Sequence, residues 1–190
     1  MKFVVTVFSL VFSAQAMGQV LPVCERTQQV QDFIVERINA VQGTEKTCAD
    51  ITRDDLASLE RISVGHRQVE SLQVGDFSGL PRLKILNLNG YLGAEFPEGL
   101  FSGLANLETL VIINAEIEQY PADFLVDTPR LKQCHCFQNP LTHIETPVID
   151  RLAALEDLEI LDFDATLDAD VQEQLRLVFP EDGQVNLTFY

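Results

Sequence analysis

The sequence predicts an α/β solenoid, a curved, right-handed stack of repeats with a parallel sheet along its concave side. The first observation is a repeated tetrapeptide, because FSGL occurs at Phe77–Leu80 and again at Phe101–Leu104, an offset of 24 residues. The second is that the same offset aligns apolar columns, the first of which holds Leu59, Leu83, Leu107 and Leu131. Such a repeat cannot bury its own apolar face, so neighbours must stack on it and caps must close both ends.

Each repeat also contains two apolar residues that flank a single other residue, which is typical of a short strand. Alternation along a strand sends these two residues to one face, so we expect them in the core. The two inward columns read Ile62, Leu86, Leu110 and Cys134, then Val64, Leu88, Ile112 and Cys136.

Three segments resemble the leucine-rich repeat pattern L-x-x-L-x-L-x-x-N-x-L: LKILNLNGYLG, LETLVIINAEI and LKQCHCFQNPL. A shifted copy, LEILDFDATL, starts at Leu158, so the fourth repeat carries a three-residue insertion around PVIDRLAALEDL. The resemblance covers residues 59–167, about five repeats, and implies a leucine-rich repeat solenoid. The family's turn asparagine is missing from most repeats, and its column reads Arg67, Tyr91, Ala115, Asn139 and Thr166. We therefore expect an irregular solenoid whose turn backbone is satisfied by other groups or by water.

Both ends of the repeat region read as caps. Residues 24–58 contain a helix with apolar residues at helical spacing, and they resemble the N-terminal cap of small exported bacterial leucine-rich repeat proteins. Thr52 is expected to cap a second helix that has Asp54 and Asp55 in its first turn. Residues 168–190 predict a helix capped by Asp168 and then a final strand, QVNLTFY.

Residues 1–16 read as a signal peptide, with Lys2 before an apolar run and a small-residue cleavage motif at its end. The mature chain is then expected to begin near Met17 and to be periplasmic, at the cell surface or secreted. A lipoprotein anchored at Cys24 is the alternative. No stretch of the sequence predicts a stable membrane span.

Export permits disulfides, and four cysteines allow three full pairings. Cys24 and Cys48 flank the first cap helix, so we predict a bridge between them. Cys134 and Cys136 occupy inward columns and are expected to be buried free thiols, with a disulfide between them as the alternative. His135 lies between them and points to the opposite face, so the three side chains are not expected to bind a metal.

The net charge of −16 argues against nucleic acid and against anionic lipid surfaces as partners. The histidines are His66, His135 and His143, and neither a phosphate-binding loop nor a hydrolase motif is present. We therefore predict a protein that is not an enzyme and holds no cofactor, although paired carboxylates leave a hydrolase as an alternative.

The concave face is the predicted binding site for a protein partner. Several of its residues are apolar where solvent favours polar ones, which indicates an interaction surface. The simpler interpretation is that strand propensity alone favours Val, Ile and Phe there. The predicted partner-binding residues are Arg61, Ile85, Asn87, Val111, Ile113, His135, Phe137, Ile160, Asp162 and Asp164.

Charge is uneven along this face. Residues 145–182 hold twelve acids and two bases, so the face is expected to run from Arg61 to an acidic end at Asp162 and Asp164. A plain solvated surface is the simpler interpretation of these acids, and steering of a basic partner is the alternative. The predicted function is therefore non-catalytic protein binding by an exported protein. The alternative is a structural envelope protein whose apolar patch is a homodimer interface.

Overall fold

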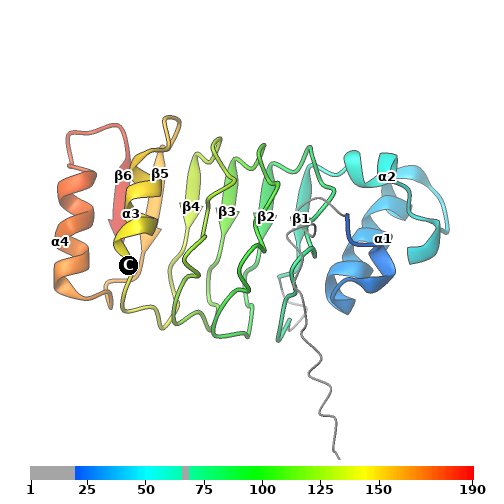
Figure 1. The fold of residues 1–190 in the computed structure, drawn as a ribbon, viewed down its shortest axis with the longest axis horizontal. Coiled ribbons are helices and arrows are strands. Elements are labelled where there is room, and N and C mark those ends of the chain that lie inside the picture. Colours follow the sequence, from blue (N-terminus) through cyan, green and yellow to red (C-terminus); the bar gives the residue numbers. More distant parts are fainter. Residues whose placement is uncertain (1–19, 66–68) are drawn as a thin grey trace, which may run out of the picture.

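A single parallel sheet runs the length of the molecule. The computed structural model describes residues 20–65 and 69–190, so the predicted signal peptide, His66 and Arg67 lie outside the described residues. The six strands follow one another in chain order, β1 to β6. They are β1 (Arg61–Ser63), β2 (Ile85–Asn87), β3 (Thr109–Val111), β4 (Gln133–His135), β5 (Ile160–Phe163) and β6 (Asn186–Phe189). Figure 1 shows them side by side, with α1 (Gln28–Gln42) and α2 (Arg53–Ala57) at one end and α4 (Ala169–Val178) at the other.

The strand register reproduces the sequence period. Ile62 lies opposite Leu86, Leu86 opposite Leu110, and Leu110 opposite Cys134. The two inward columns supply ten residues that lie on β1 to β5 or just after these strands, and all ten are between 0 and 2 % exposed. The alternation predicted from sequence is thus confirmed, because one face of every strand packs into the core of the solenoid.

The predicted insertion in the fourth repeat is occupied by helix α3 (Thr146–Ala153). Gln133 of β4 lies opposite Ile160 of β5, and three additional residues separate them compared with the earlier strand pairs. Val148, Ile149 and Leu152 turn into the core from this helix. The additional residues let the convex side of this repeat complete two helical turns, where the earlier repeats make irregular turns.

The N-terminal cap forms as predicted. Val30, Ile34 and Ile38 form the buried stripe of α1, which ends at Gly43 in the left-handed conformation (φ 66°). Thr52 and Asp55 form a reciprocal capping box at α2, in which the Thr52 hydroxyl accepts from the Asp55 N–H at 3.2 Å and Asp55 accepts from the Thr52 N–H at 2.8 Å. Two short 3-10 turns flank α1, η1 (Val23–Glu25) and η2 (Cys48–Asp50). They carry the Cys24–Cys48 disulfide, with a Cα–Cα distance of 5.1 Å.

A buried arginine joins this cap to the first repeat, a feature not anticipated from sequence. Arg26 is 4 % exposed and donates to the carbonyls of Leu21, Asp76 and Ser78, at 2.7 to 3.0 Å. Burial lowers the pKa of Arg26 to about 10, and the nearby Asp76 carboxylate opposes that change. Asp76 in turn accepts from the backbone N–H and the hydroxyl of Thr27. The cap is therefore held by polar contacts as well as by apolar packing.

The C-terminal end contains the predicted helix and strand. Asp168 occupies the N-cap position of α4, but its side chain accepts no capping hydrogen bond, so the prediction that it caps the helix is wrong in that respect. Its carboxylate turns instead towards His143, with an Oδ2–Nδ1 distance of 3.8 Å. β6 continues the parallel sheet, and Leu161 lies opposite Leu187.

Candidate binding face

The face of the sheet turned away from the core presents three rows of side chains, which we call the open face. It corresponds to the face predicted from sequence to be concave and to bind a partner. The strand register defines its first row as Arg61, Ile85, Thr109, Gln133, Ile160 and Asn186, and its second as Ser63, Asn87, Val111, His135, Asp162 and Thr188. Two residues further along lies the third row, Gly65, Asn89, Ile113, Phe137, Asp164 and Tyr190.

The apolar residues of the open face are half-buried. Ile85, Val111, Ile113, Phe137 and Ile160 all fall in this intermediate range, as does Asn87, whereas Arg61 is exposed. The register places Val111, Ile113 and Phe137 next to one another on and just after β3 and β4, whereas Ile85 on β2 and Ile160 on β5 lie in the first row. We call these five residues the apolar band. Neighbouring side chains cover part of each residue, and the remainder faces outward.

An aromatic pair extends this band towards the C-terminus. The rings of Phe137 and Tyr190 stack with their centroids 4.4 Å apart and their planes 27° from parallel. Tyr190 was not among the residues predicted for the site. Its position two residues after Thr188, on the predicted final strand, was the sequence signal that placed it on this face.

The two acids at the end of the open face are not free charges. Asp162 is 5 % exposed and Asp164 7 %. Asp164 accepts from the backbone N–H groups of Gln138 and Asn139, at 2.6 and 2.9 Å. Asp162 contacts the Nδ1 atom of His135 at 2.6 Å. The expectation of an exposed acidic end is therefore wrong, because the turn after β4 and the imidazole of His135 engage both carboxylates.

His135 lies between two cysteines of the opposite face. The side chain of His135 is 27 % exposed, whereas both cysteines are fully buried. No group of three or more His, Cys, Asp or Glu side chains within the described ranges could hold a metal ion. The strand thus separates the imidazole from the sulfur atoms, as its alternation requires.

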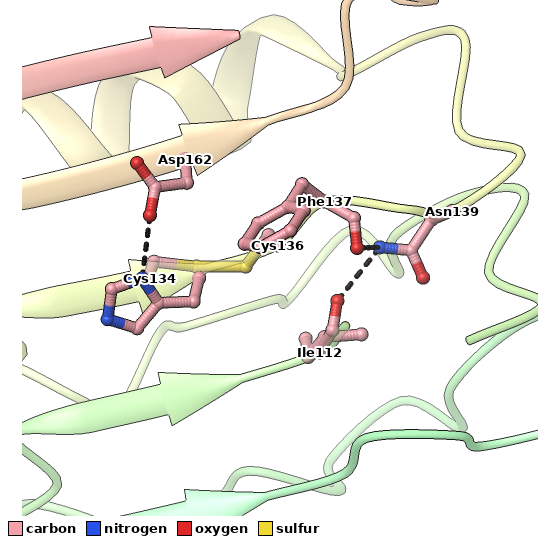
Figure 2. The surroundings of a disulfide bond; sticks show 7 residues. Ile112, Cys134, Cys136, Phe137, Asn139 and Asp162 are labelled. Atoms are coloured by element: carbon pink, nitrogen blue, oxygen red, sulfur yellow. Dashed lines mark hydrogen bonds and ion pairs between the residues drawn. A yellow bond between two sulfur atoms is a disulfide. The ribbon is translucent and has the colours of Figure 1, made fainter. Parts of the chain in front are cut away.

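The two sulfur atoms are bonded to each other, which corrects the expectation of free thiols at Cys134 and Cys136. Figure 2 shows this disulfide, which joins Cys134 of β4 to Cys136, the residue just after that strand. Their Cα atoms are 5.8 Å apart, within the range that a disulfide bridges. Side chains two apart on a strand point the same way, so the two sulfur atoms lie on the same side of the chain.

The turn after β4 is the one that follows the family pattern. The Asn139 amide donates to the carbonyls of Ile112 and Phe137, at 2.8 and 3.1 Å, as Figure 2 shows. Gln138 adopts a left-handed conformation (φ 61°) that directs its own N–H and that of Asn139 to Asp164. In the second repeat, Tyr91 occupies the position of the family's turn asparagine, and its hydroxyl donates to the Glu95 carbonyl at 3.1 Å. Hydrogen bonds from Gln138 and Asn139 therefore hold the turn next to Phe137, although the Asn139 Oδ1 atom is buried without a partner among the described residues.

A ladder of alternating charge borders the open face, just before the strands. It follows the 24-residue period of the sequence and consists of Glu60, Lys84, Glu108 and Lys132. Lys84 lies 3.3 Å from Glu60, and Lys132 lies 3.6 Å from Glu108. These charges neutralise one another, so the border contributes little net field to the open face.

Comparison with known proteins shows the fold. No protein-family model matches the sequence, and no curated protein matches it. A leucine-rich repeat protein of Leptospira interrogans matches in structure with a TM-score of 0.59 and 23 % identity, over 73 % of this chain and 34 % of that one. The leucine-rich repeat domain of APL1 matches with a TM-score of 0.51 and 18 % identity, over 72 % of this chain and 35 % of that domain. This chain thus matches about a third of the length of each.

Proposed function

We propose that this chain, which has the leucine-rich repeat fold, is an exported, non-catalytic protein that binds a partner protein through the open face of its sheet. The supporting observation is the half-exposed apolar band of Ile85, Val111, Ile113, Phe137 and Ile160, which crosses four adjacent strands. Apolar side chains gathered on one face of a sheet are typical of a protein interface, because burying them in a complex removes them from water.

Export is supported by the signal-like residues 1–16 and by two disulfides. Disulfides persist in oxidising compartments and are rare in the cytosol. Lipid attachment at Cys24 would need its sulfur, which is bonded to Cys48. Within the described part of the chain, no helix has the length and apolar character to cross a membrane. N-terminal sequencing of the exported protein should begin at Met17.

The binding face is tested by charge insertion. Val111→Asp combined with Phe137→Asp should abolish capture of a partner from cell extracts, because both carboxylates would be desolvated in the complex. The control is Val126→Asp combined with Leu177→Asp, which makes the same charge change at residues 56 % and 77 % exposed away from the sheet. Capture by the control with loss in the first variant supports the proposal. Capture by both refutes it.

Light scattering of the purified chain distinguishes self-association through the open face from the binding of a different protein. A monomer whose capture depends on Val111 and Phe137 supports a different protein as the partner. A dimer that dissociates in the Val111→Asp, Phe137→Asp variant would instead assign the band to a homodimer. The gentler change Val111→Ser provides a second measurement should the double variant be poorly folded.

A further inference from the structure

We propose that the partner inserts a lysine or arginine side chain at the C-terminal end of the open face, where the Nε2 atom of His135 accepts its hydrogen bond. This inference rests on the proposed function and adds the chemistry of the recognised group. The residues that carry it are His135, Asp162, Phe137 and Tyr190.

Asp162 determines which imidazole nitrogen faces the partner. A carboxylate only accepts hydrogen bonds, so the 2.6 Å contact with Nδ1 places the imidazole proton on that atom. In the neutral ring, Nε2 then carries a lone pair. Among the described residues no hydrogen bond is made to Nε2, and His135 is the more exposed member of the pair. The open face therefore presents an acceptor at this point, and a partner group must donate.

Charge selects a cationic donor. With a neutral imidazole, the His135–Asp162 pair carries one negative charge, and the Asp164 carboxylate lies in the next row of the same strand end. The cation of the open face, Arg61, is on β1, at the opposite end of the sheet from β6. Lys132, which precedes β4, is paired with Glu108. Protein charges at low dielectric act strongly on one another, so this end favours a positive partner group.

The neighbouring aromatic rings suit the rest of such a side chain. Lysine and arginine bury an apolar stem and leave the charged end to a polar partner. Phe137 lies two residues from His135 on the same face, and Tyr190 stacks on it while remaining 62 % exposed. Aromatic rings pack against the stem and attract a cation through their π faces. An acidic side chain would gain neither the packing of a long apolar stem nor the attraction of a cation to the rings.

The probe is a random dodecapeptide library displayed on phage and selected on the immobilised full chain at about pH 7.5. We expect the selected peptides to share a lysine or arginine. Their binding should weaken about tenfold on His135→Phe, the cost of one charge-assisted hydrogen bond. His143→Phe, the same substitution at a histidine outside the three rows of the open face, is the matched control and should leave binding unchanged.

The outcomes separate the two proposals. Peptides that bind the Val111→Asp, Phe137→Asp variant as well as the parent refute the open face as the binding site. Two results refute the lysine or arginine inference alone, both with peptides that fail to bind the Val111→Asp, Phe137→Asp variant. In the first, these peptides lack a basic residue. In the second, they bind the His135→Phe variant as tightly as the parent. A library that yields no peptide dependent on the open face also overturns the inference. Nitrogen NMR of the imidazole tests the tautomer without any ligand, and a proton on Nε2 of the neutral ring would overturn the assignment.

Discussion

The Cys24–Cys48 bridge should contribute more stability than any other single covalent feature of the fold. It closes a loop with a sequence separation of 24 residues that contains the whole of α1. In the chain-entropy description, closing a loop of that length removes about 12 cal/mol/K from the unfolded chain, or about 3.5 kcal/mol at room temperature. Domains of this kind unfold with only about 5 to 15 kcal/mol, so the loss is a large fraction of the total.

The perturbation is the double change Cys24→Ser, Cys48→Ser. Cys24 is exposed and Cys48 half-buried, so both hydroxyls reach water and little cavity is created. Urea unfolding followed by circular dichroism should show a loss of about 3.5 kcal/mol, and the melting temperature should fall by roughly 7 to 14 °C. Hydrogen exchange should rise first in α1, because the cap it forms is no longer linked at both ends.

The second disulfide provides the matched comparison. Cys134 and Cys136 are separated by only two residues, so the same relation assigns their loop closure about 1.6 kcal/mol. Both side chains are fully buried in columns that otherwise hold Val, Ile and Leu, so Cys134→Val with Cys136→Val keeps the core apolar. This variant should lose less than about 2 kcal/mol. A cap variant that loses no more stability than the strand variant would refute the loop-length argument.

Three further changes test polar groups of the core and the cap. The hydroxyl of Tyr120 is buried without a partner among the described residues, and burial raises the pKa of this tyrosine. Tyr120→Phe removes that unpaired hydroxyl and should raise the free energy of unfolding by about 1 kcal/mol. A loss of stability would instead show that the hydroxyl makes a hydrogen bond. Asn139→Ala removes two donated hydrogen bonds from a residue 6 % exposed and should cost about 2 kcal/mol in urea unfolding, and a cost near zero would contradict the role of its turn. Burial acts to raise the pKa of Asp55, but hydrogen bonds from Lys46, Thr52 and Gln42 outweigh it and hold the pKa well below its usual range. The folded state binds that proton less readily than the unfolded state, so Asp55 stabilises the fold above about pH 4 and this contribution is lost as the pH falls further; Asp55→Asn should flatten that part of the pH–stability curve.

The repeat region was the most predictable part of the molecule. Leu86, Leu110 and Cys134 lie in one buried column because a fixed offset in the sequence becomes a fixed register between strands. The cap at Thr52 was equally accessible, since a capping box depends on residues three positions apart. Where stability depends on local spacing or on strict repetition, sequence reasoning suffices.

The candidate site was predictable in outline and incomplete in its chemistry. Strand alternation correctly placed Val111, His135 and Phe137 on one face. It could not show that Asp162 is buried against His135, because that contact joins residues on different strands and depends on side-chain rotamers. The clamp of Arg26 on the carbonyls of Asp76 and Ser78 was hidden for the same reason.

The sequence by itself determined the solenoid, the inward columns and the strand residues that lie on the open face, because these follow from the period of the apolar residues and from the alternation of a strand. Only the tertiary structure decided how the polar groups pair. It joined Cys134 to Cys136, assigned Asp164 to a turn, and gave His135 a carboxylate neighbour. Pairing requires two groups to meet within hydrogen-bonding or bonding distance, and that proximity arises only when successive repeats stack.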